Sequence, residues 1–72
     1  MMTVTNVTGD EMKPKCKLIG ENGNIFNLVA IASRVLRDNG QAKEAEELNH
    51  RIWDCESYDQ ALSVIGEYVD IY

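Results

Sequence analysis

The apolar residues after position 24 recur with a period of about 3.6, which is the period of an α-helix. Between residues 25 and 39 they fall on one arc of a helical wheel, opposite a polar arc. Asn24 can cap the start of such a helix, and Asn39 with Gly40 supplies a left-handed exit. The pattern predicts a first helix at about 25–39. Its apolar arc consists of Ile25, Leu28, Val29, Ile31, Ala32, Val35 and Leu36.

A second helical pattern covers residues 41–54 and has a narrower apolar stripe than the first. Glutamates near its start favour the positive end of the helix dipole, and Glu47 is spaced to form an i, i+4 ion pair with Arg51. We expect solvent to cover most of this helix, and Trp53, on the flank of the stripe, to fill the core. The stripe consists of Ala45, Leu48 and Ile52.

The third helical pattern, at about 58–71, is apolar over about half of its circumference. Ser57 and Gln60 have the spacing of a capping box, in which each side chain bonds a backbone amide. A helix with so wide an apolar surface must contact more than one neighbour. Either it lies between the other two helices, or one side of it contacts another molecule. For the second case, the candidate protein interface consists of Val64, Tyr68, Ile71 and Tyr72.

The segment before the first helix alternates basic and apolar residues, as a short strand with one solvated face does. Cys16 and Leu18 lie on one side of it and lysines on the other, which predicts a strand at 15–19. Pro14 at its start indicates an edge strand. Residues 1–12 are polar and β-branched, and they predict a flexible arm or a weak strand.

These elements predict a single, mainly α domain of the α+β class at residues 13–72: a short N-terminal strand or small hairpin followed by a three-helix unit. The chain has 72 residues, of which 44% are hydrophobic and 26% charged, and these are the proportions of one small soluble domain. A domain of this length buries only about 60% of the surface that its unfolded chain exposes. Its stability is therefore marginal, and self-association is a natural support.

The charge of the chain is acidic and unevenly distributed. Twelve acidic and seven basic residues give a net charge of −5. Residues 1–37 carry five bases against three acids, whereas residues 38–72 carry two bases against nine acids. The acidic total disfavours nucleic-acid binding without excluding a local basic patch. Since no apolar run approaches about 20 residues and the start lacks signal-peptide features, we expect a cytoplasmic protein without membrane contact.

A Gly-x-x-Gly spacing is the sharpest motif in the sequence. Gly20 and Gly23, followed by Phe26, resemble the signature of KH domains, in which two glycines let the backbone approach a phosphate. Glu21 stands at an unfavourable position for such contact, and helix follows where KH domains have a three-stranded sheet. A tight turn between strand and helix is therefore the interpretation that we favour. The nucleic-acid alternative uses Lys13, Lys15, Lys17, Gly20, Gly23, Arg34 and Arg37.

The reactive side chains do not form a catalytic constellation in the sequence. His50, the only histidine, is spaced for a surface pair with Glu46. Cys16 and Cys55 have no cysteine or histidine beside them, which favours buried reduced thiols over a redox pair or a zinc site. The carboxylates lack the spacing of a calcium loop. We therefore expect no enzymatic activity, no cofactor and no metal site.

The segment from Leu18 to Phe26 fits the pattern Leu-x-Gly-x-[Asp/Asn]-Gly-Asn-x-Phe. With the segments 35–40, 57–62 and 67–71, it resembles a group of small bacterial proteins encoded by prophages and conjugative elements. Ser57 departs from that group, where many members have Gly or Asp. The resemblance covers about three quarters of the chain, and it implies an accessory role in a bacterial cytoplasm without assigning any functional residue.

Together these patterns predict a non-enzymatic protein–protein interaction or accessory protein of a bacterial mobile element. Its partner is another protein or a second copy in a homodimer, with self-association through the last helix. The alternative function is a small nucleic-acid-binding accessory factor that uses the basic strand and the Gly20–Gly23 turn. A third hypothesis is that the acidic second half mimics DNA and occupies a basic partner.

Overall fold

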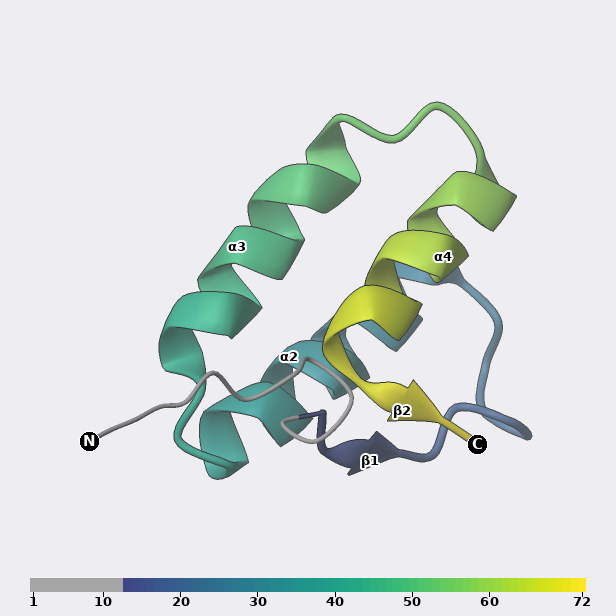
Figure 1. The fold of residues 1–72 in the computed structure, drawn as a ribbon. Helices are drawn as coiled ribbons and strands as arrows, with labels where there is room; N and C mark the ends of the chain where they lie inside the picture. Colours follow the sequence, from purple (N-terminus) through teal and green to yellow (C-terminus); the bar gives the residue numbers. More distant parts are fainter. Residues whose placement is uncertain (1–12) are drawn as a thin grey trace.

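A computed structural model describes residues 13–72, and the arm predicted for residues 1–12 lies outside the described residues. The domain is mainly helical with two short strands, as the sequence predicts (Figure 1). The predicted helices at 25–39 and 41–54 are confirmed to within one residue at each end. The elements in chain order are β1 (Lys15–Cys16), α2 (Ile25–Asp38), α3 (Ala42–Trp53), α4 (Tyr58–Tyr68) and β2 (Asp70–Ile71).

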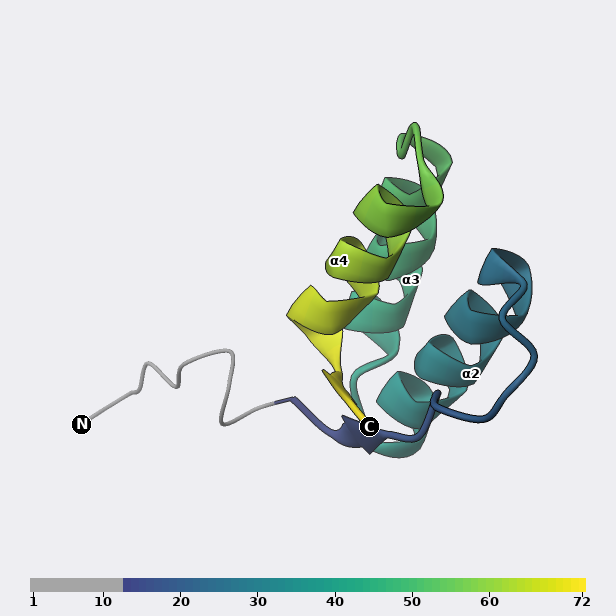
Figure 2. The same cartoon turned by 90° about the vertical axis from the view of Figure 1, so that its right-hand side faces the viewer.

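Helices α3 and α4 lie side by side, and α2 packs across both of them (Figures 1 and 2). Both views place the two strands and the C-terminal end of α2 at one end of the molecule. The connection between α3 and α4 lies at the opposite end. The molecule therefore has a strand end and a loop end, and these names are kept below.

The core lies where the three helices meet and extends beneath β1. Helix α4 contacts both other helices, which explains its wide apolar surface within the single chain. Ser33 is the buried polar residue of the described chain, and its hydroxyl accepts a hydrogen bond of 2.8 Å from the Asn49 amide. The largest fully buried side chains are Cys16, Leu36, Leu48, Ile65 and Val69.

The predicted end of the last helix at residue 71 is wrong, because α4 ends at Tyr68. Val69 is already extended, and Asp70 and Ile71 form β2, which pairs with β1 in parallel. The register places Lys15 opposite Asp70 and Cys16 opposite Ile71. The strand partner of the N-terminal segment therefore comes from the other end of the described chain, which replaces the alternative of a small N-terminal hairpin.

The predicted strand at 15–19 is also shorter in the structure, since regular pairing covers only Lys15 and Cys16. Its neighbours stay attached to the C-terminal segment by other bonds. The backbone N–H groups of Leu18 and Ile19 both donate to the Tyr72 carbonyl oxygen, at 2.7 and 3.0 Å. Burial still alternates through this segment, because Cys16 and Leu18 are buried while residues 15, 17 and 19 are exposed.

The predicted caps at Asn24 and Ser57 are confirmed. The Asn24 side chain accepts a hydrogen bond from the Phe26 backbone N–H, and Ser57 accepts one from the Gln60 N–H. The Gln60 side chain reaches back to the Glu56 N–H at 2.9 Å, one residue earlier than the capping-box pattern places it. Gly40 has a φ of 76°, as a left-handed exit from α2 requires. In the described part of the chain, no helix has the length and apolarity to span a membrane.

Candidate interaction surface

Three large aromatic side chains are exposed at the loop end. Phe26 is 62% exposed, Trp53 is 76% exposed and Tyr58 is 47% exposed. The rings of Phe26 and Trp53 contact each other, with centroids 6.2 Å apart and an interplanar angle of 51°. The prediction that Trp53 fills the core is therefore wrong. Trp53 is the last residue of α3, and its ring covers the first turn of α2 from outside.

These aromatic rings border a groove with a volume of about 380 Å³, which we call the aromatic groove. The start of α2, the end of α3 and the start of α4 meet there. Half-buried Ile25 and Ile52 join the groove to the core. The Tyr58 hydroxyl donates a hydrogen bond of 2.6 Å to the Gly23 carbonyl, which holds the start of α4 against the turn before α2. The groove is lined by Ile25, Phe26, Ile52, Trp53, Cys55, Glu56, Ser57, Tyr58 and Ala61.

The segments that form the aromatic groove carry only negative formal charges. Residues 21–33 and 52–63 contain four acids and no lysine, arginine or histidine. All four carboxylates are exposed, and Glu56 lines the groove itself. The lining of the groove therefore combines apolar area with the carboxylate of Glu56. The four acids are Glu21, Asp54, Glu56 and Asp59.

The four residues of the predicted protein interface on the last helix differ in exposure and do not form one exposed surface. Val64 is 7% exposed within the core, and Tyr68 is half-buried between α3 and α4. Ile71 belongs to β2, is half-buried, and packs beside Gly66 of α4. Of the four predicted residues, only Tyr72 is exposed, at 53%. The last helix thus uses most of its apolar surface inside the chain.

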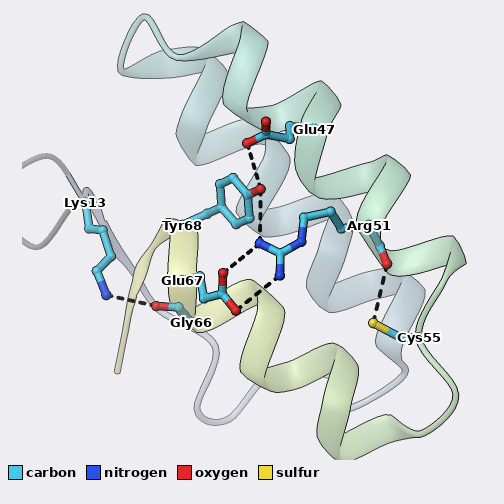
Figure 3. A network of polar contacts seen from close by, with 7 residues as sticks. All are labelled: Lys13, Glu47, Arg51, Cys55, Gly66, Glu67 and Tyr68. Carbon is cyan, nitrogen blue, oxygen red and sulfur yellow. Dashed lines mark hydrogen bonds and ion pairs between the residues drawn. The ribbon is translucent and has the colours of Figure 1, made fainter.

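A polar network joins α3 to the end of α4 (Figure 3). The Arg51 guanidinium donates to both carboxylate oxygens of Glu67, at 2.6 and 3.2 Å. It also donates to the Tyr68 hydroxyl and lies 5.6 Å from the centre of the Tyr68 ring. The Tyr68 hydroxyl in turn donates to Glu47 at 2.7 Å. The predicted pairing of Glu47 with Arg51 is therefore replaced by a link from each of them to α4.

The charges and pKa shifts of this network fit a structural link between α3 and α4. Hydrogen bonding from Arg51 lowers the pKa of Glu67, while partial burial raises the pKa of Tyr68. Both shifts move the pKa values of these groups further from neutral pH, whereas acid–base catalysis needs a group whose pKa lies near the working pH. Arg51 and Glu67 are also well exposed, with side-chain exposures of 43% and 55%. The network holds α3 and α4 together and suits structure better than catalysis.

We expect the Glu67→Gln variant to lose part of the pH dependence of stability. Because the folded-state pKa of Glu67 is lowered, its carboxylate stabilises the fold above its unfolded pKa, and this contribution disappears as the pH falls through the folded pKa. The wild type should therefore lose more stability than Glu67→Gln between about pH 7 and about pH 3. Urea unfolding at both pH values measures this, and an identical loss in both proteins would contradict it.

The exposed residues of the predicted basic patch lie in the β1 segment and on α2, two elements that pack together. Since β1 packs against α2, the exposed Lys15 and Lys17 share the strand end with the C-terminal half of α2, which carries the exposed Arg34 and Arg37. The Lys13 ammonium donates to the Gly66 carbonyl at 3.0 Å (Figure 3), so this lysine also contributes to internal packing.

The Gly20–Gly23 turn is exposed and connects β1 to α2. Gly20 has a φ of 94°, which favours glycine, whereas Gly23 has no positive φ and bonds Tyr58 through its carbonyl. Within residues 13–72 the structure contains two short strands, where a KH domain has a three-stranded sheet. The turn is that of a strand-to-helix connection, as the sequence analysis favours.

A second groove runs along α3 and has a volume of about 520 Å³. Its lining has mixed charge, with Arg37, Lys43 and His50 beside Glu46. It shares Trp53 with the aromatic groove, but Lys43 lies ten residues before Trp53 on the same helix, or roughly 15 Å along its axis. Among the described residues, no three histidine, cysteine or acidic side chains are grouped so that they could hold a metal ion.

The two cysteines are both free thiols but differ in their surroundings. Cys16 is 1% exposed, and burial raises the pKa of its thiol. Cys55 is half-buried, lines the aromatic groove and donates to the Arg51 carbonyl at 3.5 Å (Figure 3).

We expect iodoacetamide to modify Cys55 in the native protein and Cys16 only after unfolding, because alkylation requires an accessible thiolate. Peptide mass spectrometry after timed alkylation, with and without denaturant, measures both sites. Modification of both thiols at the same native rate would contradict the burial of Cys16.

Comparison of the chain with protein families, curated proteins and solved structures finds no match. The resemblance to mobile-element proteins and the cytoplasmic setting that it implies therefore stay predictions. The residues that sequence reasoning missed are the three exposed aromatics. A signal was present for two of them, because Phe26 falls outside the apolar arc of its helix and Trp53 lies on the flank of its stripe.

Proposed function

We propose that this protein is a non-enzymatic interaction module and that the aromatic groove is its contact surface for another protein. The observation that carries the proposal is the convergence of Phe26, Trp53 and Tyr58, all exposed, from three helices onto one groove. Contiguous exposed apolar surface is uncommon on monomeric proteins and typically marks an interaction site. Aromatic side chains, and tryptophan above all, dominate the binding energy of protein interfaces.

Two contacts within the groove support the same conclusion. The Phe26–Trp53 contact and the bond from Tyr58 to Gly23 hold the rings before a partner arrives. A preorganised surface loses little conformational entropy on binding. By contrast, Val64 of the predicted contact surface on the last helix is buried and Tyr68 and Ile71 are half-buried, so only Tyr72 is strongly exposed there.

Capture experiments with matched variants test the proposal. Immobilised wild-type protein, Phe26→Ser, Trp53→Ser and Tyr72→Ser are incubated with the same bacterial lysate, and retained proteins are quantified by mass spectrometry. Tyr72→Ser is the matched control, because it removes an exposed aromatic ring outside the groove lining and tests the surface first predicted at the chain's end.

We expect proteins that bind the wild type and Tyr72→Ser to lose at least tenfold in affinity for both groove variants, as for hot-spot residues. Circular dichroism should show that all four proteins are folded, since the substituted side chains are exposed. If the groove variants retain every protein that the wild type retains, the proposal is wrong. If only Tyr72→Ser loses binding, the interface lies at the terminal residues instead.

Nucleic-acid binding is the second candidate, and the exposure of Lys15, Lys17, Arg34 and Arg37 on neighbouring elements favours it. The net charge of −5 opposes it at long range. Titration with single- and double-stranded oligonucleotides at low salt should shift the amide resonances of these residues if the function holds, and the shifts should fade as salt rises. Unchanged spectra at low salt would exclude it.

A further inference from the structure

The molecule carries a surface that complements its own aromatic groove. The exposed face of the N-terminal segment presents Lys15, Lys17 and Ile19 at alternate positions, and we call these residues the lysine edge. Ile19 is 71% exposed, which makes it the only large aliphatic side chain among the strongly exposed hydrophobics of the described residues. The lysine edge is thus an apolar side chain beside positive charge, whereas the groove is an apolar surface beside negative charge.

We propose that the aromatic groove binds the lysine edge of a second copy of this chain, so that copies associate head to tail. This inference rests on the proposed function and names the partner of that surface. In the complex, the Ile19 side chain packs in the groove against the rings of Phe26 and Trp53. The two lysines face the carboxylates at the loop end.

The geometry of the lysine edge suits this role. Lys15 and Lys17 flank the buried Cys16, and Ile19 begins the turn that the Glu21 N–H closes on the Leu18 carbonyl. The three exposed side chains thus follow one another in a short row along the chain, with regular strand geometry only at its start. The intervening Cys16 and Leu18 are buried, and the Leu18 and Ile19 N–H groups bond the Tyr72 carbonyl. The row is therefore held on a fixed backbone, which limits the entropy lost when it docks.

The charges of the two surfaces are complementary. Residues 52–63, which supply most of the groove lining, carry three acids and no base, while residues 13–19 carry three lysines and no acid. Glu21, whose N–H donates to the Leu18 carbonyl, lies beside the lysine edge and offsets part of its charge. Asp70 lies opposite Lys15 in the strand pair and offsets part of this charge, so Lys17 is the residue whose attraction to the groove we expect to matter most. Lysine ammonium groups also bind favourably over aromatic faces.

The two surfaces lie at different ends of the molecule, because the lysine edge belongs to the strand end and the groove to the loop end (Figures 1 and 2). One copy therefore cannot satisfy both surfaces by folding back on itself. A contact between two different surfaces is heterologous, and it produces a ring or an open chain of copies instead of a closed dimer.

Sedimentation velocity on the full chain tests this arrangement. We expect the wild type to form dimers and larger species as its concentration rises toward about 1 mM, the weak end of specific association. Raising the salt concentration should weaken the association, because the charges involved are exposed to solvent. Protection of Cys55 from iodoacetamide at high protein concentration supplies a second readout, since this thiol lines the groove.

Two variants make the test specific for a heterologous contact. Trp53→Ser disables binding by the groove and leaves the lysine edge intact. The double variant Lys17→Glu with Ile19→Ser disables the lysine edge and leaves the groove intact. Each variant alone should be monomeric, with a dissociation constant at least tenfold above the wild-type value. An equimolar mixture should form a dimer and nothing larger, because each pair then has one intact contact.

The outcomes separate the two proposals. A monomeric wild type at low salt, or variants that associate as the wild type does, would overturn the head-to-tail inference. So would a mixture that stays monomeric although both variants are folded by circular dichroism. If the wild type is monomeric while Phe26→Ser and Trp53→Ser still lose a captured protein, the groove binds a different partner. If neither association nor capture responds to those substitutions, the proposed function fails as well.

Discussion

Replacing Ile65 by alanine should cost about 2–5 kcal/mol of the free energy of unfolding, the range measured for removing a large aliphatic side chain from a core. Ile65 is 0% exposed and lies on α4, which packs against both other helices. A chain of this length has a total stability of only about 4–11 kcal/mol. The substitution is therefore expected to leave a substantial unfolded fraction at room temperature, seen as a lowered urea midpoint or an absent native baseline.

Ile19→Ala is the matched control for this prediction. It removes the same side-chain atoms from a residue that is 71% exposed, and we expect the free energy of unfolding to change by less than about 0.5 kcal/mol. The measurement is made at low micromolar concentration, so that association of the kind proposed above does not shift the midpoint. Equal losses for the two variants would show that α4 does not pack between its neighbours as described.

The helix boundaries could be predicted from the sequence because their signals are local. Asn24 and Ser57 cap the helices that follow them, and Gly40 adopts the left-handed conformation for which glycine is suited. Each signal acts within a few residues, so the chain around it suffices to place the boundary. The same holds for the alternation of Cys16 and Leu18, which correctly predicts the face of β1 that is buried.

The end of α4 could not be placed in this way. Val69 and Ile71 fit the apolar stripes of a longer helix, and neither glycine nor proline follows to stop it. What competes with the helix is pairing of Asp70 and Ile71 with Lys15 and Cys16, a contact between opposite ends of the described chain. A helical wheel considers one segment at a time and contains no information about that partner.

The aromatic groove was missed for a related reason. A helical wheel shows which side of a helix is apolar, but not where along its axis the neighbouring helix ends. Trp53 is the last residue of α3 and Phe26 is in the first turn of α2, and both rings stay exposed at these helix ends. The candidate site therefore arises where helix ends meet, and only the packing of all three helices reveals it.

The Val69→Asp variant should lose even more stability than Ile65→Ala. Val69 is 1% exposed at the junction of α4 and β2, where its N–H donates to the Ile65 carbonyl. A carboxylate at this position is either buried without a partner or protonated at a cost, and both leave a polar group in the core. We expect no cooperative unfolding transition at neutral pH, measured by circular dichroism in urea. Asp70→Asn is the matched control, because the adjacent residue is exposed and its backbone bond to Pro14 is unchanged.

Hydrogen exchange on the wild type distinguishes two alternatives for residues 69–71: the strand β2 of the structure and the longer helix that the sequence predicts. In the structure, the amides of Leu18 and Ile19 donate to Tyr72, and those of Asp70 and Tyr72 donate to Pro14 and Cys16. All four should exchange slowly, because their bonds break only when β1 and β2 separate. If α4 instead continued to residue 71, the amides of Leu18 and Ile19 would lose these acceptors and exchange quickly. Slow exchange at residues 18 and 19 is expected from their bonds to Tyr72, so these two amides are the most informative for choosing between the alternatives.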